Sequence, residues 1–462
     1  MNINLLDLTI MLGYLLLILL VGLLKSKRAN SLDYMLMGRR LSLPAFVMTL
    51  VSTWYGGILG VSEFSTSYGV SNWVIFGLPY YVFGIGFALL IAKKARIMGV
   101  TSLPEIIRND YGVSAGRLAS IWVLLLANPA PYILTLGFLL SYFFGLSLPL
   151  AIVVGALFSL LYIYRGGFKS VVDTDKIQFG LMFLGFLVLL AVLMTKYMNP
   201  IELWSQLPDS HRSLSGGHSF GYILVWFFIA SWTLVDPGFH QRVYATTTPN
   251  VARKGILMAV LFWFIFDCMT TLTGLYAFLL LPDNTIPAQA FLEIGSQILP
   301  VGLQGLFFAG ILATVMSTLD SNTLVSGIMI GNDLLVDTRL ARTKSKSSLI
   351  RSGMLLVVTL GVIIALVLPS VVDLWYTFGT IALPALLAPT LLSIFNRPLV
   401  RKAVILNLSL PPLVSLFWYA FAKVDEWSYL YGLEPFYPGV IMSLLIFSYF
   451  QLSKKETVQN GN

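Results

Sequence analysis

The sequence predicts an all-α integral membrane protein with about 13 transmembrane helices. The chain has 462 residues, of which 57% are hydrophobic and only 11% are charged, whereas soluble domains carry about 25% charged residues. Its apolar runs are long enough for helices, since about 20 residues cross a bilayer. The short alternating strands of a membrane barrel are not seen in the sequence, so helices are favoured.

Apolar stretches follow one another along the whole chain. They cover residues 8–24, 42–60, 71–92, 118–140, 143–163, 176–197, 220–237, 255–281, 303–332, 349–368, 371–395, 403–421 and 437–453. If the N-terminus lies outside, all Lys and Arg residues except Lys196, Arg212 and Lys423 fall in inner loops. This positive-inside bias predicts a multi-pass protein of the plasma (inner) membrane with a cytoplasmic C-terminus. The first stretch has no preceding cation, unlike a cleaved signal peptide, and is expected to be retained.

The positive charge follows from this topology. The net charge of +8 is spread over seven inner segments, so we expect no nucleic-acid partner. No Lys or Arg falls in the middle of an expected span. A strongly anionic solute held by a buried arginine is therefore not expected.

Two of the stretches have the composition of broken helices. The second contains Tyr55-Gly56-Gly57, and the seventh ends in Asp236-Pro237-Gly238. Interrupted helices at matching places in two halves point to an inverted-repeat transporter that binds its cargo at the breaks. The alternative is ordinary glycine packing and a helix stop at proline. The offset of five spans favours the transporter.

The ninth stretch carries an unusual group of polar side chains. Thr314, Ser317, Thr318 and Asp320 lie within an apolar run from 306 to 330, where polar groups are costly and mark functional sites. An all-oxygen group suits a hard cation, so the sequence predicts an ion site. The alternative is that the hydroxyls bond carbonyls of their own helix.

Two membrane acids leave several roles open. Asp267 lies in the middle of the eighth stretch, where it can contact solute, bind an ion or a proton, or act as a buried protonated donor. Asp320 either couples ion binding to transport or pairs with local structure. Both residues keep a proton-coupled carrier open as an alternative.

Four motifs, in order along the chain, resemble those of the sodium:solute symporter family. They are Gly38-Arg39-Arg40-Leu41-Ser42-Leu43-Pro44, Thr101-Ser102-Leu103-Pro104-Glu105, Asp173-Thr174-Asp175-Lys176-Ile177-Gln178, and Ala313 to Asp320 with Asn332-Asp333. The resemblance implies ten core helices arranged as five plus five inverted helices. Residues 34–396 are then the transport core. Residues 1–33 form an N-terminal extra helix with its inner loop, and 397–462 form two C-terminal helices and a cytoplasmic tail.

The resemblance also implies an ion site. The sodium site of the family takes hydroxyls and a carbonyl from the helix that holds Thr314, Ser317 and Thr318. Backbone carbonyls of the unwound first core helix complete it, here in the stretch Ser52 to Gly56, with Ser52 and Tyr55 as the expected ligands. Asp175 matches an aspartate that influences sodium release. Asp320, with Ser317 and Ser321, is a candidate for a second ion.

For the solute, the resemblance is less direct. Trp232 matches an aromatic residue that stacks on the substrate in sugar carriers, and Trp54, Gly56 and Trp263 are expected as further contacts. Trp263 stands where sugar carriers have a lysine, which argues against sugar.

The expected function is a sodium-driven secondary symporter that imports a small polar solute by alternating access. Its partners are the solute, sodium and the lipid bilayer, and no cofactor is expected besides Na⁺ as the coupling ion. A transporter-like sensor of the same fold is an alternative. An intramembrane enzyme is disfavoured because the sequence lacks a Gly-x-Gly-Asp stretch and an in-membrane Ser and His pair.

Overall fold

The computed structural model describes residues 4–24, 30–368, 370–397, 399–423 and 429–459. The α-helices are α1 Leu5–Leu24, α2 Ser31–Leu36, α3 Leu43–Ser52, α4 Ile58–Tyr68, α5 Leu78–Gly86, α6 Ala92–Ile97, α7 Leu103–Tyr111, α8 Val113–Leu126, α9 Ala130–Phe144, α10 Leu148–Lys196, α11 Pro200–Gln206, α12 Asp209–Arg212, α13 Phe220–Ile229, α14 Pro237–Ala245, α15 Pro249–Leu280, α16 Ala290–Ile298, α17 Leu303–Ile328, α18 Arg339–Thr343, α19 Lys346–Val367, α20 Val371–Ile394, α21 Arg401–Phe421 and α22 Phe436–Gln459. Shorter 3₁₀ and π segments are Met37–Arg39, Trp73–Gly77, Phe87–Ile91, Ala230–Leu234, Pro287–Gln289, Met329–Leu334 and Leu430–Gly432. Lys25, Lys27 and Arg28, which the sequence assigns to the first inner loop, lie outside the described residues.

The helices confirm the predicted fold class. Within the described residues, 10 stretches are long and apolar enough to cross a membrane. Helix α10 has 49 residues and changes direction at Gly167, where φ is 59°. At 1.5 Å per residue it would be about 74 Å long if straight, so it supplies two crossings of a layer about 30 Å thick. Together with the α3–α4 pair and the shorter apolar part of α22, Phe436–Gln451, this agrees with the predicted number.

Both predicted breaks are present. Helix α3 ends at Ser52 and α4 begins at Ile58. In the second break, α13 passes into the 3₁₀ segment Ala230–Leu234, and α14 begins at Pro237. The Asp236 side chain caps α14, and Pro237 occupies the first turn, where its missing N–H has no cost.

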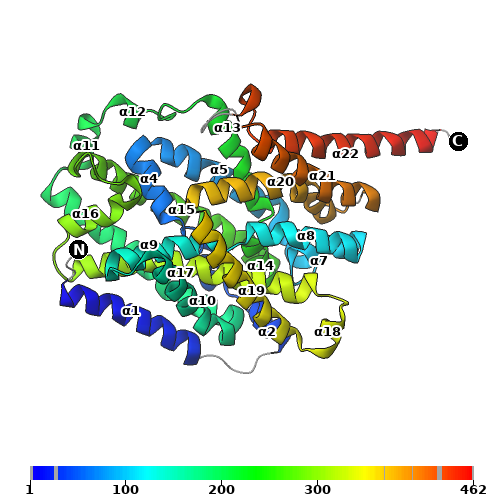
Figure 1. Ribbon diagram of the computed structural model, residues 1–462, viewed down its shortest axis with the longest axis horizontal. Coiled ribbons are helices and arrows are strands. Elements are labelled where there is room, and N and C mark those ends of the chain that lie inside the picture. Colours follow the sequence, from blue (N-terminus) through cyan, green and yellow to red (C-terminus); the bar gives the residue numbers. More distant parts are fainter. Residues whose placement is uncertain (1–3, 25–29, 369, 398, 424–428, 460–462) are drawn as a thin grey trace.

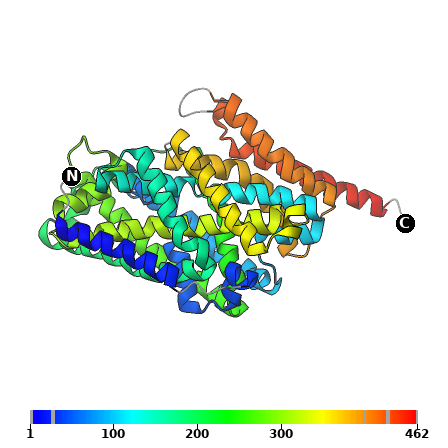
Figure 2. The same ribbon diagram turned by 60° about the horizontal axis from the view of Figure 1, so that its bottom comes forward.

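The arrangement of the short helices agrees with the predicted alternation of loops (Figure 1). Helices α11, α12 and α16 lie at the end of the molecule that holds the N-terminus, and α2 and α18 lie toward the other end. The sequence places the first group outside and the second inside. Helices α21 and α22 pack on each other at one edge of the bundle (Figure 2), and α22 runs six residues beyond the expected span, to Gln459.

Helix α17 is the buried centre of the bundle. Almost all of its residues are inaccessible to solvent, and it packs most extensively against α10. A Cβ on Gly310 would lie 2.7 Å from the Leu181 carbonyl oxygen, so glycine permits this close approach. Asp7 of α1 accepts hydrogen bonds from the backbone N–H groups of Gly302 and Gly305, each at 2.7 Å. The extra N-terminal helix thus caps the helix that carries the predicted ion site.

Candidate ion site and solute cavity

The break between α3 and α4 lies against the middle of α17. Because the helix is interrupted, the carbonyl oxygens from Ser52 to Gly56 accept no hydrogen bond from the described part of the chain. Gly56 faces Thr318 so closely that a Cβ there would lie 2.5 Å from the Thr318 Cβ and 2.7 Å from its Oγ1. Unpartnered backbone carbonyls and a buried hydroxyl are therefore neighbours.

The hydroxyls of α17 divide into two kinds. Ser317 Oγ donates to Asp175 Oδ1 at 2.7 Å and lies 2.9 Å from Ser52 Oγ, so it joins three elements. Thr314 Oγ1 instead donates to the Gly310 carbonyl of its own helix at 2.8 Å, which is the alternative that the sequence left open. Thr318 Oγ1 likewise donates to a carbonyl of its own helix, that of Thr314, at 3.3 Å. Thr314 therefore presents its carbonyl, not its hydroxyl, to this region.

Gly56→Ala should disrupt the ion region more than Gly60→Ala does. An added methyl group at Gly56 meets Thr318 and Tyr132 at 2.5 Å, whereas at Gly60 the nearest atoms are 3.4 Å away, an ordinary contact. We expect the Gly56 variant to need about tenfold or more sodium to reach the same stabilisation, since overpacking costs about 1–3 kcal/mol. Sodium titration of thermal unfolding in both variants checks this. Equal sodium titrations for the two variants would contradict the placement of Gly56 at the ion site.

Arg242 is buried beside Asp175 in the last turn of α14, although the sequence assigns it to an inner loop. Its side chain is only 1% exposed. Its guanidinium lies 3.5 Å from Asp175 Oδ2 and donates to Thr49 Oγ1, the Gly238 carbonyl and Ser321 Oγ at 3.2, 3.2 and 2.8 Å. Burial is possible because Asp175 balances the charge and every side of the guanidinium has an acceptor.

The residues proposed for a second ion are separated. Asp320 accepts hydrogen bonds from Ser159 and Tyr162 of α10, while Ser321 is bonded to Arg242. The guanidinium thus lies between Asp175 and Ser321. Asp267 accepts a hydrogen bond from Tyr81 and is not among the residues that line the cavity described next.

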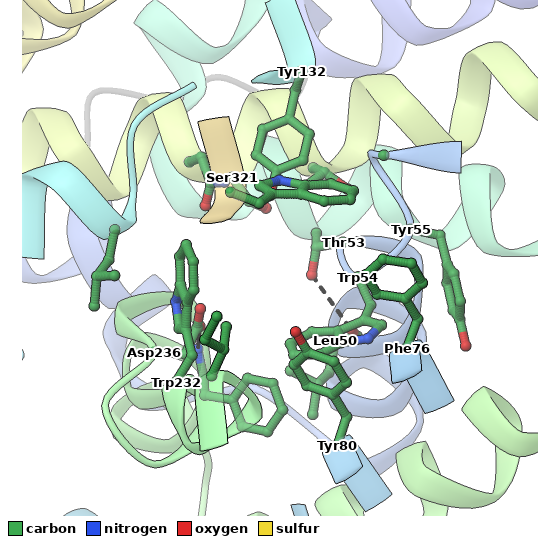
Figure 3. A pocket seen from close by; sticks show the side chains of 18 of the residues that line it. Leu50, Thr53, Trp54, Tyr55, Phe76, Tyr80, Tyr132, Trp232, Asp236 and Ser321 are labelled. Atoms are coloured by element: carbon green, nitrogen blue, oxygen red, sulfur yellow. Dashed lines mark hydrogen bonds between the residues drawn. The ribbon is translucent and has the colours of Figure 1, made fainter. Parts of the chain in front are cut away.

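A cavity of about 120 Å³ adjoins the ion region and shares Thr318 with it. Since about 10–15 Å³ is enough to hold one water, the cavity has room for a small solute. Its walls come from both broken helices, from the π segment Trp73–Gly77 and from α5, α8, α9, α17 and α20, and nine of the 21 lining residues are aromatic (Figure 3). The aromatic lining residues are Trp54, Tyr55, Phe76, Tyr80, Tyr132, Trp226, Trp232, Phe239 and Trp375.

Of the predicted solute contacts, some line the cavity and others do not. Trp54 and Trp232 line the cavity. Trp263 is fully buried and stacks behind Trp54 with ring centroids 4.8 Å apart, so it supports the wall without lining it. Gly56 faces Thr318, and its neighbour Gly57 lines the cavity instead. The Tyr55 hydroxyl donates to the Trp263 carbonyl at 3.0 Å, which leaves its backbone carbonyl as the group available to an ion.

Sequence reasoning missed other lining residues. Asp236 lies in the same break as Trp232. Its position close to an expected solute contact could have identified it. Tyr80, Tyr132 and Trp375 come from other helices, and no local pattern distinguishes them from aromatic residues that face lipid.

Two broken helices, an oxygen-rich break and a cavity of solute size between them define a secondary transporter. The chain belongs to the sodium:solute symporter family, whose model matches residues 34–402. It is thus a sodium-driven symporter of a small solute, as predicted, with Na⁺ as its coupling ion.

The relatives are transporters. The sodium/pantothenate symporter of Haemophilus influenzae is 25% identical over 358 residues, which cover 70% of this chain and 74% of the relative. The sodium/proline symporter of the same species is 22% identical over 495 residues, which cover 96% and 94%. The solved structure of a Na⁺-coupled sialic acid symporter in a substrate-bound outward-open state matches with a TM-score of 0.80 at 18% identity and covers 98% of both chains. At that identity the structural likeness concerns the fold.

Proposed function

We propose that this symporter binds sodium between α17 and the α3–α4 break. The ligands are the backbone carbonyls of Ser52, Tyr55 and Thr314 and the hydroxyls of Ser317 and Thr318. The observation that carries this assignment is the row of unpartnered carbonyls opposite two buried hydroxyls. These neutral oxygens suit a hard cation, and the absence of a full charge among them favours release as well as binding.

The solute binds in the aromatic cavity, which shares Thr318 with the ion site. Sodium that holds the α3–α4 break against α17 also fixes Trp54 and Tyr55 in the cavity wall. Solute affinity then rises with sodium, and sodium affinity with solute, because coupling between two sites is reciprocal. Transport is import by alternating access across the plasma membrane, with the N-terminus outside and residues 34–396 as the transport core.

One sodium ion accompanies each solute in this proposal. The position between Asp175 and Ser321 is filled by the Arg242 guanidinium, and Asp320 is bonded by Ser159 and Tyr162. Asp175 accepts a hydrogen bond from Ser317 and acts on the sodium site through it. Its role is to influence the release of sodium.

Uptake into proteoliposomes tests the proposal. The full chain is reconstituted, and labelled sugars, amino acids, vitamins and organic amines are offered under an inward sodium gradient or a matched potassium gradient, at neutral and acidic pH. We expect uptake of one class of solute only under the sodium gradient. Sodium-independent uptake that increases with acidity would instead establish proton coupling, with Asp267 as the candidate carboxyl.

A further inference from the structure

A second cavity lies between α1, α9, α10 and α17 and shares no lining residue with the solute cavity. These four helices lie close together (Figure 1), and α1 and α9 both pack against α10 and α17. The volume of the second cavity is about 320 Å³, whereas the solute cavity has about 120 Å³. None of its nine lining residues is charged or carries a hydroxyl, amide or ring N–H group.

Water does not suit this cavity. A buried water needs hydrogen bonds to two or more polar groups, and the walls offer only the weak acceptor of Met316. The Met316 sulfur already accepts the Tyr14 hydroxyl at 3.7 Å. An empty cavity is unfavourable too, because its walls lose dispersion contacts. The walls therefore fit an apolar occupant.

The cavity is continuous with the surface that faces lipid. Val154 of α10 lines the cavity and is 43% exposed, so the cavity reaches the surface of the bundle there. Leu150 and Leu157 of the same helix are also exposed. Helix α10 is a membrane-spanning helix, and exposed apolar side chains of such a helix contact the hydrocarbon of the bilayer. The established lipid interface thus extends into the cavity at Val154.

The depth of the cavity matches that of lipid tails. In the proposed topology, α10 begins on the outer side at Leu148 and α17 at Leu303. At 1.5 Å per residue, Val154 lies about 9 Å and Met316 about 20 Å along their helices, in a hydrocarbon layer about 30 Å thick. The cavity therefore runs from the outer half of the bilayer to near its middle, where the surrounding molecules are acyl chains.

We propose that this cavity binds one acyl chain of a membrane phospholipid. The chain enters beside Val154 and ends against Met316. Met316 precedes Ser317 in α17, and the two side chains have different neighbours: Met316 contacts Tyr14 of α1 and the cavity, while Ser317 contacts the end of α3. The lipid thus supports the central helix away from its ion region. The binding site itself does not depend on the proposed function.

Native mass spectrometry of the full chain, released from nanodiscs into detergent, tests the proposal. Three nanodisc preparations carry the same palmitoyl and oleoyl chains on phosphatidylglycerol, phosphatidylethanolamine or phosphatidylcholine headgroups. Since the walls contact only hydrocarbon, we expect one phospholipid to remain bound to each protein chain in all three preparations, after the other lipids have been removed.

Two neighbouring positions give matched variants. Val154→Trp places an indole at the mouth of the cavity, so we expect the bound phospholipid to be lost. Val153→Trp is the control, because Val153 is 38% exposed but does not line the cavity, and it should retain the phospholipid. Leu140→Trp fills the cavity from the α9 wall and should lose the phospholipid as well. A cooperative thermal unfolding transition shows that each variant is folded.

Several outcomes would overturn the inference. They are the absence of any retained phospholipid in the unmodified protein, and equal retention in Val154→Trp and Val153→Trp. Retention with only one headgroup would indicate a headgroup site in place of an acyl-chain site. A lipid-free dimer would indicate that a second copy of the chain covers the cavity. Each of these results leaves sodium-dependent uptake, and with it the proposed function, untouched.

Discussion

The double variant Ser317→Ala with Thr318→Ala should abolish sodium-dependent uptake. It removes both side-chain oxygens of the proposed ion site and leaves only backbone carbonyls. Bonds to a charged group contribute about 1.5–3 kcal/mol each, so sodium affinity should fall about 100-fold or more. Thermal unfolding with increasing sodium, without any solute, measures this directly, because the stabilisation follows the ratio of sodium concentration to its dissociation constant.

Thr314→Val and the single variant Thr318→Ala are the controls. The Thr314 hydroxyl bonds Gly310 of its own helix, and valine keeps the backbone carbonyl, so the sodium response should be retained. Ser317 also donates to Asp175, whereas Thr318 has no bond to that carboxylate among the described residues. A loss in Thr318→Ala alone therefore reports the ion site and not the Asp175 contact. If the double variant keeps the sodium response of the unmodified protein, the ion lies elsewhere.

The sequence predicts those features of this transporter that depend on residues close together along the chain. The crossings follow from apolar length, and the two breaks follow from Gly56-Gly57 and Asp236-Pro237-Gly238, where glycine and proline interrupt helices. Thr314, Ser317 and Thr318 were recognisable because hydroxyls are unusual in an apolar helix. Their apposition to Ser52 and Tyr55 was not a local property, and it came from the family resemblance.

The parts that the sequence did not predict depend on partners distant along the chain. Arg242 looks like a loop cation until Asp175, on another helix, is brought to 3.5 Å. Asp320 looks like an ion ligand until Ser159 and Tyr162 supply its hydrogen bonds. Trp54 and Trp263 were both expected to contact the solute, and only packing decides that Trp54 lines the cavity and Trp263 stands behind it.

Arg242→Gln should make the sodium dependence of stability steeper. Without the guanidinium, Asp175 is a buried charge that keeps its hydrogen bonds from Thr49 and Ser317 but has lost its cation, and breaking a buried ion pair in this way costs about 3–5 kcal/mol. A sodium ion can then occupy the vacated position beside Asp175 and Ser321. We expect the variant to be strongly destabilised in potassium, to recover in sodium, and to show a Hill coefficient for sodium above one. The unmodified protein should show a coefficient near one.

The matched control is Arg242→Gln combined with Asp175→Asn. Removing both charges should restore most of the stability lost in potassium. It should also return the Hill coefficient to about one, since nothing then attracts a second ion. The deviation of the changes in unfolding free energy from additivity gives the coupling energy of the Arg242–Asp175 pair. An Arg242→Gln protein with the sodium response of the unmodified chain would show that Asp175 needs no cation, and the assignment of one sodium per solute would lose its basis. The distinction matters for energetics, because a cation tethered to α14 stays with the protein through the cycle, whereas a second sodium would cross the membrane and add its own gradient to the driving force.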